Sequence, residues 1–349
     1  MSPERIEARA PTRIDLAGGT IDIWPLYLLH DGAVTVNAAI DLMATAIVER
    51  HAGPEVEIES LDRGSRFSVA SRQRLAAAIA EAPPELEFVV RLAAHYLAAS
   101  SRAGTETSGG CRIITSCRAP AGSGLGGSSA LGIALASALQ RHTGTRFSSE
   151  RLLAVTRAIE TQTLRIPTGE QDYHPALHGG PLALHYTVEG TRVERLAVDA
   201  AALRERLVLL YTGKSRSSGL SNWDMLKRHL DGDAQVRAAM DGVIRATRDL
   251  RAALLAGDFD GVGPALASEW AARKQLSPAV TDPIIDDLID TGIGAGALAG
   301  KVCGAGGGGC VVLWTRAGRR DEVASAIAAA GAEVLAFRLR STGVEITET

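Results

Sequence analysis

The architecture of this chain follows from one segment, RAPAGSGLGGSSALGIALASALQRH, at residues 118–142. The apolar residues Cys111, Ile113 and Ile114 precede it, and it closes with leucines and alanines at helical spacing. Between them stand four glycines within six residues, Gly122, Gly124, Gly126 and Gly127. Glycine permits backbone conformations that a Cβ opposes, so the pattern predicts a strand that ends at Pro120, a glycine-rich loop and a helix.

The start of that helix predicts an anion-binding site. The first turn of a helix leaves four N–H groups without partners, and the helix dipole makes that end positive. Glycines without side chains let a pyrophosphate approach the backbone closely. A chain reversal needs one or two glycines, so four glycines followed by Ser128 and Ser129 favour phosphate binding over a structural turn.

Two other phosphate-binding patterns fit less well. Residues 122–127 match G-x-G-x-x-G, but the dinucleotide fingerprint belongs on the first strand of a βαβ unit. The residues that follow here predict a helix, a turn and another helix. The segment GKS at 213–215 is not a Walker A loop because Val208 stands where its first glycine belongs. An NAD-dependent oxidoreductase is the weaker alternative.

Three segments, in order along the chain, resemble the motifs of one superfamily. PAGSGLGGSSALG (120–132) is similar to the second motif of the GHMP kinases, the group of galactokinase, homoserine kinase and mevalonate kinase. APTRIDLAGGTID (10–22) resembles the first motif and KVCGAGGGGCVVL (301–313) the third. The resemblance implies an α+β fold of two domains. Residues 1–202 would form a ribosomal-protein S5-like, ATP-binding domain and residues 203–349 a ferredoxin-like domain, with the active site between them.

The same resemblance implies ATP as the phosphate donor, with Mg²⁺. In the family the second motif holds the ATP phosphates. Family members place a magnesium-binding glutamate on the helix before the catalytic loop, and Glu160 matches it. Mg²⁺ favours hard oxygen ligands, so a hydroxyl of Ser128 or Ser129 would complete the protein ligation. The nucleotide contacts implied are Pro120, Gly122, Ser123, Gly124, Leu125, Gly126, Gly127, Ser128 and Ser129.

The catalytic pair is also implied by resemblance. IPTGEQDYHPALHGG (166–180) is similar to the family's G-x-x-D segment and places Asp172 in register. Asp172 would receive the proton of the substrate hydroxyl and orient that hydroxyl toward the γ-phosphate. Arg13 stands where the family often has lysine, and we expect it to supply charge and orientation because arginine does not release a proton at neutral pH.

Three groups of residues predict the contacts with the acceptor substrate. The first is a polar cluster beside the first glycine turn, which suits a polyol. The second is a basic loop after an apolar strand, suited to a substrate phosphate. The third is the second glycine run, expected to pack against the phosphate loop. Their members are Asp15, Gly18, Gly19, Thr20 and Asp22; Lys214 and Arg216; and Gly304, Gly306 and Gly307.

The branch of the superfamily follows from finer likeness. RIDLAGGTID and GAGGGG look most like the enzymes that phosphorylate the anomeric hydroxyl of sugars, the heptose 7-phosphate kinases and fucokinases. Heptose kinases tend to have a longer glycine run, and fucokinases a tryptophan where Thr20 stands. A sugar 1-kinase acting on a heptose 7-phosphate is therefore expected, with a mevalonate- or homoserine-type kinase and an inert nucleotide-binding regulator as alternatives.

Composition agrees with a small-molecule enzyme. The 349 residues, 46% hydrophobic and 22% charged with net charge −3, predict two ordinary globular domains and no nucleic-acid partner. The four cysteines have neither metal-site spacing nor the density of a disulfide scaffold, which predicts reduced thiols and a cytoplasmic protein. The charged N-terminus and the small residues of 124–139 predict neither export nor membrane association, and a monomer or homodimer is expected.

The remaining pattern predicts elements that frame these motifs. Short strands are expected around Pro11 in residues 5–16, and a pair of strands in residues 33–50. A structural helix is expected at 86–97 and a second, capped helix at 148–164. A hairpin at 181–198 and a mainly helical region at 219–293 complete the expectation.

Overall fold

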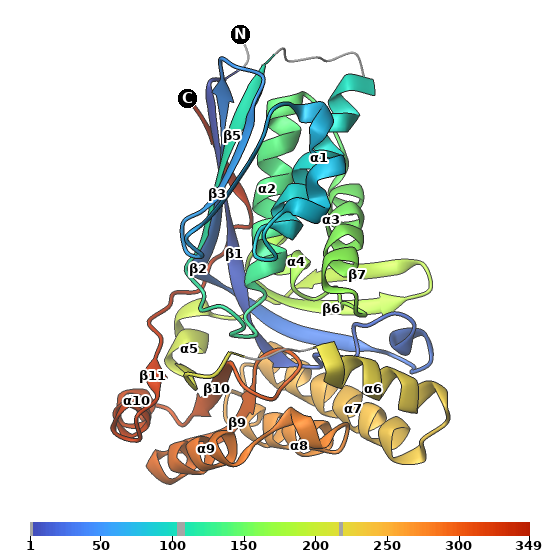
Figure 1. Cartoon of the computed structure of the whole chain (residues 1–349). Helices are drawn as coiled ribbons and strands as arrows, with labels where there is room; N and C mark the ends of the chain where they lie inside the picture. Colours follow the sequence, from blue (N-terminus) through green and yellow to red (C-terminus); the bar gives the residue numbers. More distant parts are fainter. Residues whose placement is uncertain (1–2, 103–108, 216–218) are drawn as a thin grey trace.

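A computed structural model describes residues 3–102, 109–215 and 219–349. Two sheets with their helices lie one above the other in Figure 1, and the chain crosses from the first to the second near residue 200. This two-domain α+β arrangement confirms the expected fold class. Arg216 falls outside the described residues, so its predicted phosphate contact has no structural counterpart.

The first sheet has eight strands in the order β12-β1-β2-β5-β3-β4, with β6 and β7 continuing from β2. Neighbours are antiparallel except β3 and β5, which run parallel. The strands are β1 (Arg5–Ala17), β2 (Val34–His51), β3 (Val56–Ser60), β4 (Ser65–Val69), β5 (Gly110–Cys117), β6 (Pro181–Thr187), β7 (Gly190–Arg195) and β12 (Glu345–Glu348).

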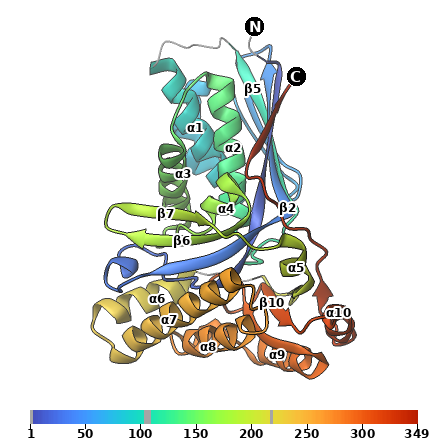
Figure 2. The same cartoon turned by 180° about the vertical axis from the view of Figure 1, so that it is seen from behind.

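Three helices cover one face of this sheet, as Figures 1 and 2 show from opposite sides. They are α1 (Glu87–Arg102), α2 (Gly127–Thr143) and α3 (Ser149–Leu164), and short α4 (Tyr173–His178) lies beside them. Helix α2 is buried along most of its length because alanines, glycines and leucines let it pack between the sheet and its neighbours. Helix α3 begins as predicted, since the Ser148 hydroxyl accepts a hydrogen bond from Arg151 N at 3.3 Å.

Two expectations about strands were wrong in the same way. Residues 34–51 form the single strand β2, whose first half pairs with β6 and whose second half pairs with β5. Neither glycine nor proline interrupts this stretch, so it bends from one partner to the other without reversing. The short strands expected around Pro11 are likewise one strand, β1, where a register shift between Ala10 and Thr12 accommodates the proline that lacks an N–H.

The second sheet has the antiparallel order β11-β8-β10-β9. Taken in chain order its strands stand 4-1-3-2, and helices join the first to the second and the third to the fourth, the βαββαβ arrangement of a ferredoxin-like domain. Its strands are β8 (Leu207–Tyr211), β9 (Ala297–Val302), β10 (Cys310–Thr315) and β11 (Glu333–Val334). Helix α5 (Ala200–Glu205) precedes the first of these strands. The helices that follow it are α6 (Gly219–Leu230), α7 (Ala234–Ala256), α8 (Val262–Lys274), α9 (Pro283–Ala295) and α10 (Arg320–Ala329).

The end of the chain departs from the predicted second domain of 203–349. After β11 the chain runs back along the molecule, and β12 pairs with the edge of β1, where Glu348 lies opposite Ile6. One apolar core also spans the two sheets, because Leu16 and Val36 of the first pack in the same cluster as Leu209 and Val312 of the second. The two units are therefore held together by a shared core and by their own chain ends.

No helix in residues 3–102, 109–215 or 219–349 is long and apolar enough to cross a membrane. None of the four cysteines forms a disulfide bond.

Candidate active site

The glycine-rich loop connects β5 to α2 and is shaped by one glycine in particular. Gly126 caps α2 in the left-handed conformation, with φ +73°. A Cβ at this position would also lie 3.1 Å from the Cβ and Cγ of Asp172. Glycine is needed here for both reasons, and the close approach places the Asp172 carboxylate directly beside the first turn of α2.

Both sheets anchor the loop. Arg13 N of β1 donates to the Leu125 carbonyl at 3.0 Å, and Cys310 N of β10 donates to the Ser123 carbonyl at 2.7 Å. The second glycine run, between β9 and β10, therefore packs against the phosphate loop as expected. The Leu125 side chain is fully buried in the shared core, so this residue anchors the loop through its side chain and does not offer that side chain to a ligand.

Asp172 and Arg13 form an ion pair at the base of the loop. Arg13 Nε donates to Asp172 Oδ1 at 2.9 Å, Nη2 donates to the same oxygen, and Nη1 donates to the Gly124 carbonyl. Burial alone would lower the pKa of Arg13, but the carboxylates of Asp172 and Asp15 outweigh burial and raise it. Arg13 thus stays charged, and Asp172 Oδ2 accepts no hydrogen bond from any described residue.

Glu160 lies on α3 at the other side of Asp172, almost fully buried. Three hydroxyls donate to its carboxylate, Ser128 at 2.5 Å, Ser129 at 2.9 Å and Tyr173 at 2.5 Å. Burial raises the pKa of Glu160, while the three hydroxyl donors act in the opposite direction. The predicted Glu160, Ser128 and Ser129 are therefore in direct contact, and Tyr173 is a third partner that the pattern analysis did not identify.

These residues fit a magnesium ion. Carboxylate and hydroxyl oxygens are the ligands that Mg²⁺ prefers, and one or two protein ligands suffice when phosphates supply the others. No group of three or more His, Cys, Asp or Glu side chains arranged for a metal occurs in the described parts of the chain. A tightly caged metal is therefore absent there, whereas Glu160 with a serine hydroxyl could hold an ion shared with a nucleotide.

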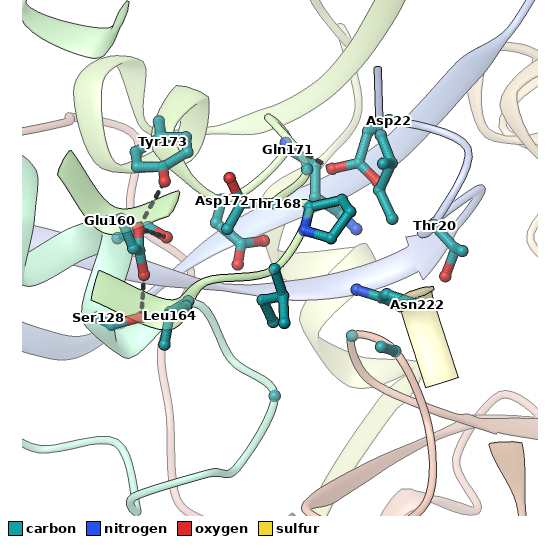
Figure 3. A pocket seen from close by; sticks show the side chains of 18 of the residues that line it. Thr20, Asp22, Ser128, Glu160, Leu164, Thr168, Gln171, Asp172, Tyr173 and Asn222 are labelled. Carbon is teal, nitrogen blue, oxygen red and sulfur yellow. Dashed lines mark hydrogen bonds between the residues drawn. The ribbon is translucent and has the colours of Figure 1, made fainter. Parts of the chain in front are cut away.

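Two cavities meet at Asp172. The first, which we call the nucleotide cavity, runs along the phosphate loop toward β3 and α1. The second, the acceptor cavity, lies between α3, the segment before α4 and the loop after β9 (Figure 3). The nucleotide cavity is lined by residues that include Asp62, Arg63, Glu85, Phe88, Pro120, Gly122, Ser123, Gly126, Gly127 and Leu131. Gly124, Ser128 and Asp172 line both cavities.

The acceptor cavity has a polar lining with an apolar rim. Its polar members are Arg13, Thr20, Asp22, Ser128, Ser129, Glu160, Thr168, Gln171, Asp172 and Asn222. Ile23, Leu164, Ile166 and Pro167 add apolar surface, and Gly304 with Ala305 adds backbone from the second glycine run. Figure 3 shows Asp172 between the Glu160 group on one side and Asp22 with Gln171 on the other.

Two residues of the acceptor cavity are not predicted by the sequence pattern. Gln171 is buried, and its Oε1 has no hydrogen-bond partner among the described residues. Asn222 comes from α6, fifty residues farther along the chain. The position of Gln171 directly before the predicted Asp172 was a signal that could have identified it. The nucleotide cavity likewise takes Phe88 from α1, a helix expected to be purely structural.

Several predicted substrate residues lie elsewhere. Asp15 is fully buried in ion pairs with Lys301 and Arg273, at 3.1 and 3.4 Å, so its carboxylate is not offered to a ligand. Gly19 packs against that ion-paired group, Gly18 packs against Val34 and Thr35 of β2, and neither glycine lines the acceptor cavity.

Of the predicted contacts on the second domain, one lines the acceptor cavity and the other described residues lie elsewhere. Gly304 lines the acceptor cavity, but Gly306 and Gly307 pack on residues 278–280, where Gly307 N donates to the Val280 carbonyl at 2.7 Å. Lys214 is half-exposed and pairs with Asp282 at 3.1 Å, away from the cavity lining.

Asp22 is a buried carboxylate of the acceptor cavity with a raised pKa. Burial raises its pKa to about 6; the hydrogen bond from Gln171 N, 2.9 Å from Oδ2, opposes this shift, and the carboxylates of Asp172 and Asp15 add to it. A buried carboxylate that is incompletely compensated is costly to the fold and is typical of a ligand-binding position.

Comparison with protein families matches two models to this chain. The model "GHMP kinases N terminal domain" matches residues 87–180, and "GHMP kinases C terminal" matches residues 250–333. The first match contains the phosphate loop, Glu160 and Asp172, and the second contains the glycine run that packs on the loop.

Similar proteins cover nearly the whole chain. D-glycero-alpha-D-manno-heptose 7-phosphate kinase of Campylobacter jejuni is 24% identical over 97% of this chain and 98% of its own length. Mevalonate kinase of Thermococcus onnurineus is 24% identical over 99% of both chains. Among solved structures, a D-glycero-D-manno-heptose 1-phosphate kinase from Bacteroides thetaiotaomicron superposes with a TM-score of 0.78 over 99% of both chains at 23% identity, which shows a common fold.

The raised pKa of Asp22 predicts a pH-dependent stability. A carboxyl whose pKa is raised on folding stabilises the fold fully below its unfolded pKa of about 4, and this contribution is lost as the pH rises through about 6. Asp22→Asn should therefore raise the free energy of unfolding at pH 7.5 by about 1–3 kcal/mol and leave it nearly unchanged at pH 4. Urea unfolding at several pH values measures this, with exposed Asp231→Asn as the control. An equal effect of Asp22→Asn at every pH would contradict the assignment.

Proposed function

This chain belongs to the GHMP kinase family, and from that premise we propose that it transfers the γ-phosphate of ATP to a hydroxyl of a sugar. The match of both family models, one in each sheet's domain, establishes the premise. Beyond membership of the family, we propose where the two substrates bind and what each residue does at the point where they meet.

The observation that carries the proposal is the junction of the two cavities at Asp172. A nucleotide whose phosphates lie on the first turn of α2 would bring its terminal phosphate to the end shared by Gly124, Ser128 and Asp172. An alcohol in the acceptor cavity would reach the same point from the other side. Phosphoryl transfer requires attacking oxygen and phosphorus roughly in line with the leaving oxygen, which two cavities meeting end to end allow.

The residues at the junction suit this chemistry. Arg13 holds Asp172 through Oδ1, which leaves Oδ2 to accept the hydrogen of the attacking hydroxyl. Because Arg13 fixes the position of the carboxylate, we assign Asp172 chiefly to orientation of the attacking hydroxyl, with the proton passing to it as transfer proceeds. The N–H groups of the first turn of α2 point toward the negative charge that gathers on the phosphate oxygens.

We assign the magnesium ion to Glu160 and a hydroxyl of Ser128 or Ser129. Magnesium bound there with the nucleotide would neutralise charge on the β- and γ-phosphates. Ser128 and Ser129, which donate to Glu160, would each have a hydroxyl oxygen close enough to that carboxylate to help hold the ion. Tyr173 would keep its hydrogen bond to the carboxylate and hold its orientation.

A sugar is the acceptor that the cavity suits best. The carboxylate of Asp22, the unpartnered Gln171 Oε1 and the Asn222 amide offer several hydrogen-bonding groups, and a sugar offers several neighbouring hydroxyls. The name of the relative from Campylobacter jejuni includes a heptose 7-phosphate, and the motif likeness points to the anomeric hydroxyl of such a sugar. We therefore take a heptose 7-phosphate as the first candidate. A mevalonate-type acceptor is the second, because that relative also matches along its entire length.

A substrate panel tests this choice. The full chain is incubated with ATP, Mg²⁺ and, in turn, heptose 7-phosphates, fucose, galactose, mevalonate and homoserine, and ADP release is coupled to identification of the product by NMR. We expect turnover of at least one sugar or sugar phosphate with phosphate on its anomeric oxygen. Turnover of mevalonate or homoserine alone would reject the sugar assignment. Tight ATP binding without turnover of any acceptor would favour an inert regulator.

Removal of the Asp172 charge should slow the chemical step. Asp172→Asn keeps the size of the side chain but removes its ability to take a proton, and we expect kcat to fall by about 10²–10⁴. The KM for ATP should change by no more than about threefold, because the phosphate loop is unaltered. Steady-state kinetics on the best acceptor measures both, and calorimetric ATP binding verifies the fold. A variant with undiminished kcat would show that another group takes the proton.

Removal of the Glu160 charge should weaken magnesium binding. For Glu160→Gln we expect the Mg²⁺ concentration that gives half-maximal activity to rise about tenfold or more, since a neutral amide is a poor ligand for this ion. Mn²⁺ binding in the presence of a non-hydrolysable ATP analogue, followed by electron paramagnetic resonance, provides a reading independent of activity. Glu150→Gln, on the exposed side of the same helix, is the matched control. An unchanged metal requirement would remove Glu160 from the ligand set.

A further inference from the structure

Four charged side chains from both domains form a fully buried group behind the acceptor cavity. Asp15 comes from β1, Glu269 and Arg273 from α8, and Lys301 from β9. All four are fully buried, two acidic and two basic, so the charges balance. We call these residues the ion cluster.

Each charge in the ion cluster has an opposite partner. Lys301 Nζ lies 3.1 Å from Asp15 Oδ1 and 2.9 Å from Glu269 Oε1. Arg273 Nη1 lies 3.4 Å from Asp15 Oδ2 and 3.2 Å from Glu269 Oε1. Charged side chains are stable in the interior of a protein only when they are paired and hydrogen-bonded. The pairing explains why the four residues pack together, but it does not use all of Arg273.

The second nitrogen of Arg273 reaches past the ion cluster into the wall of the acceptor cavity. Nη2 donates to Thr20 Oγ1 at 2.9 Å and to the Gly304 carbonyl. Thr20 follows β1 of the first sheet, and Gly304 follows β9 of the second. Both residues line the acceptor cavity, so one guanidinium group connects a part of its wall from the first sheet to a part from the second.

The backbone at Thr20 needs such support. Thr20 has φ +80°, a left-handed conformation that β-branched residues rarely adopt. The preceding glycines let the turn sit directly on the ion cluster, because a Cβ on Gly19 would lie 2.9 Å from Arg273 Nη1 and would overlap Asp15. Gly18 N in turn donates to Glu269 Oε1 at 3.1 Å. The turn that carries Thr20 is thus seated on the ion cluster, with Arg273 as its side-chain contact.

We propose that Arg273 is a positioning residue that sets the width and shape of the acceptor cavity by holding Thr20 and Gly304 at a fixed separation, and thereby governs which acceptor is used. The inference rests on the proposed kinase function for its catalytic reading. Arg273 does not line the cavity, so it acts through the two residues it holds.

The guanidinium group suits this role because of its geometry. Its planar fork donates from two nitrogens in different directions, so it serves the carboxylates with Nη1 and the cavity wall with Nη2. A lysine at this position would keep the buried charge but has a single nitrogen. It can satisfy the ion cluster or the wall, and the neighbouring carboxylates favour the ion cluster.

The experiment compares Arg273→Lys with Lys301→Arg. Each exchange retains the charge of a cation that touches Asp15 and Glu269, but Lys301 donates its hydrogen bonds to these two carboxylates and none to Thr20 or Gly304. For Arg273→Lys we expect the KM for the best acceptor of the sugar panel to rise at least about tenfold, because the wall of the cavity loses a hydrogen bond from a charged donor. The KM for ATP should stay within about twofold, and the preference between that sugar and its epimers should narrow. Lys301→Arg should lower the melting temperature without this split.

A second pair of variants tests the shared hydrogen bond without disturbing the ion cluster. Thr20→Val removes Oγ1 at nearly constant volume, and Thr20→Ser retains it. We expect Thr20→Val to raise the acceptor KM, Thr20→Ser to leave it within about threefold, and Arg273→Lys to add little once Thr20 is Val. Full additivity of the two changes, or equal effects of Arg273→Lys on both KM values, would overturn the proposal.

Hydrogen exchange separates this inference from the proposed function. Backbone amides of residues 18–23 should exchange faster in Arg273→Lys than in Lys301→Arg, in the absence of any substrate. If wild type phosphorylates no sugar but this difference is found, the kinase assignment fails and the positioning role of Arg273 stands. If wild type is an active sugar kinase and the two variants exchange alike, the positioning role fails.

Discussion

The ion pair between Arg13 and Asp172 is the contact on which the site depends. It joins the middle of β1 to the segment that opens α4, and through the Gly124 carbonyl it also holds the loop between β5 and α2. Gly126 leaves the space that lets Asp172 approach the helix start. A positive helix end, a fixed carboxylate and a fixed guanidinium therefore occupy one small region.

The two sheets contribute different things to that region. The first sheet and the helices on its face supply the phosphate loop, Glu160 and Asp172. The second sheet supplies the glycine run that hydrogen-bonds to the loop, the wall at Gly304, and the cations that neutralise Asp15. Since one core runs through both sheets, the acceptor cavity is a product of their packing and belongs to neither sheet separately.

Buried charge in this protein divides into two kinds. In the ion cluster every carboxylate has cationic partners, which makes it a rigid structural joint. Asp22 and Glu160 lack such partners, and burial raises the pKa of both. The fold tolerates these two carboxylates at a cost in stability, as is usual for groups whose partners arrive with a substrate or a metal.

Local pattern was sufficient for the backbone and for the residues attached to it. The strand, glycine loop and helix at 111–142, the capped helix at 149–164 and the hairpin at 181–195 follow from spacing and turn chemistry, and the three glycine-rich segments identify the family. The contacts of Glu160 with Ser128 and Ser129 agree with motif likeness.

Packing decided what spacing does not encode: that β2 is one bent strand, that β12 returns to β1, and which polar residues of the first motif face the cavity. Asp15 and Asp22 look alike in the sequence, but Asp15 meets Lys301 across 286 residues of chain and is neutralised, whereas Asp22 lines the acceptor cavity. Such partners are set by long-range burial of charge, which no local pattern records.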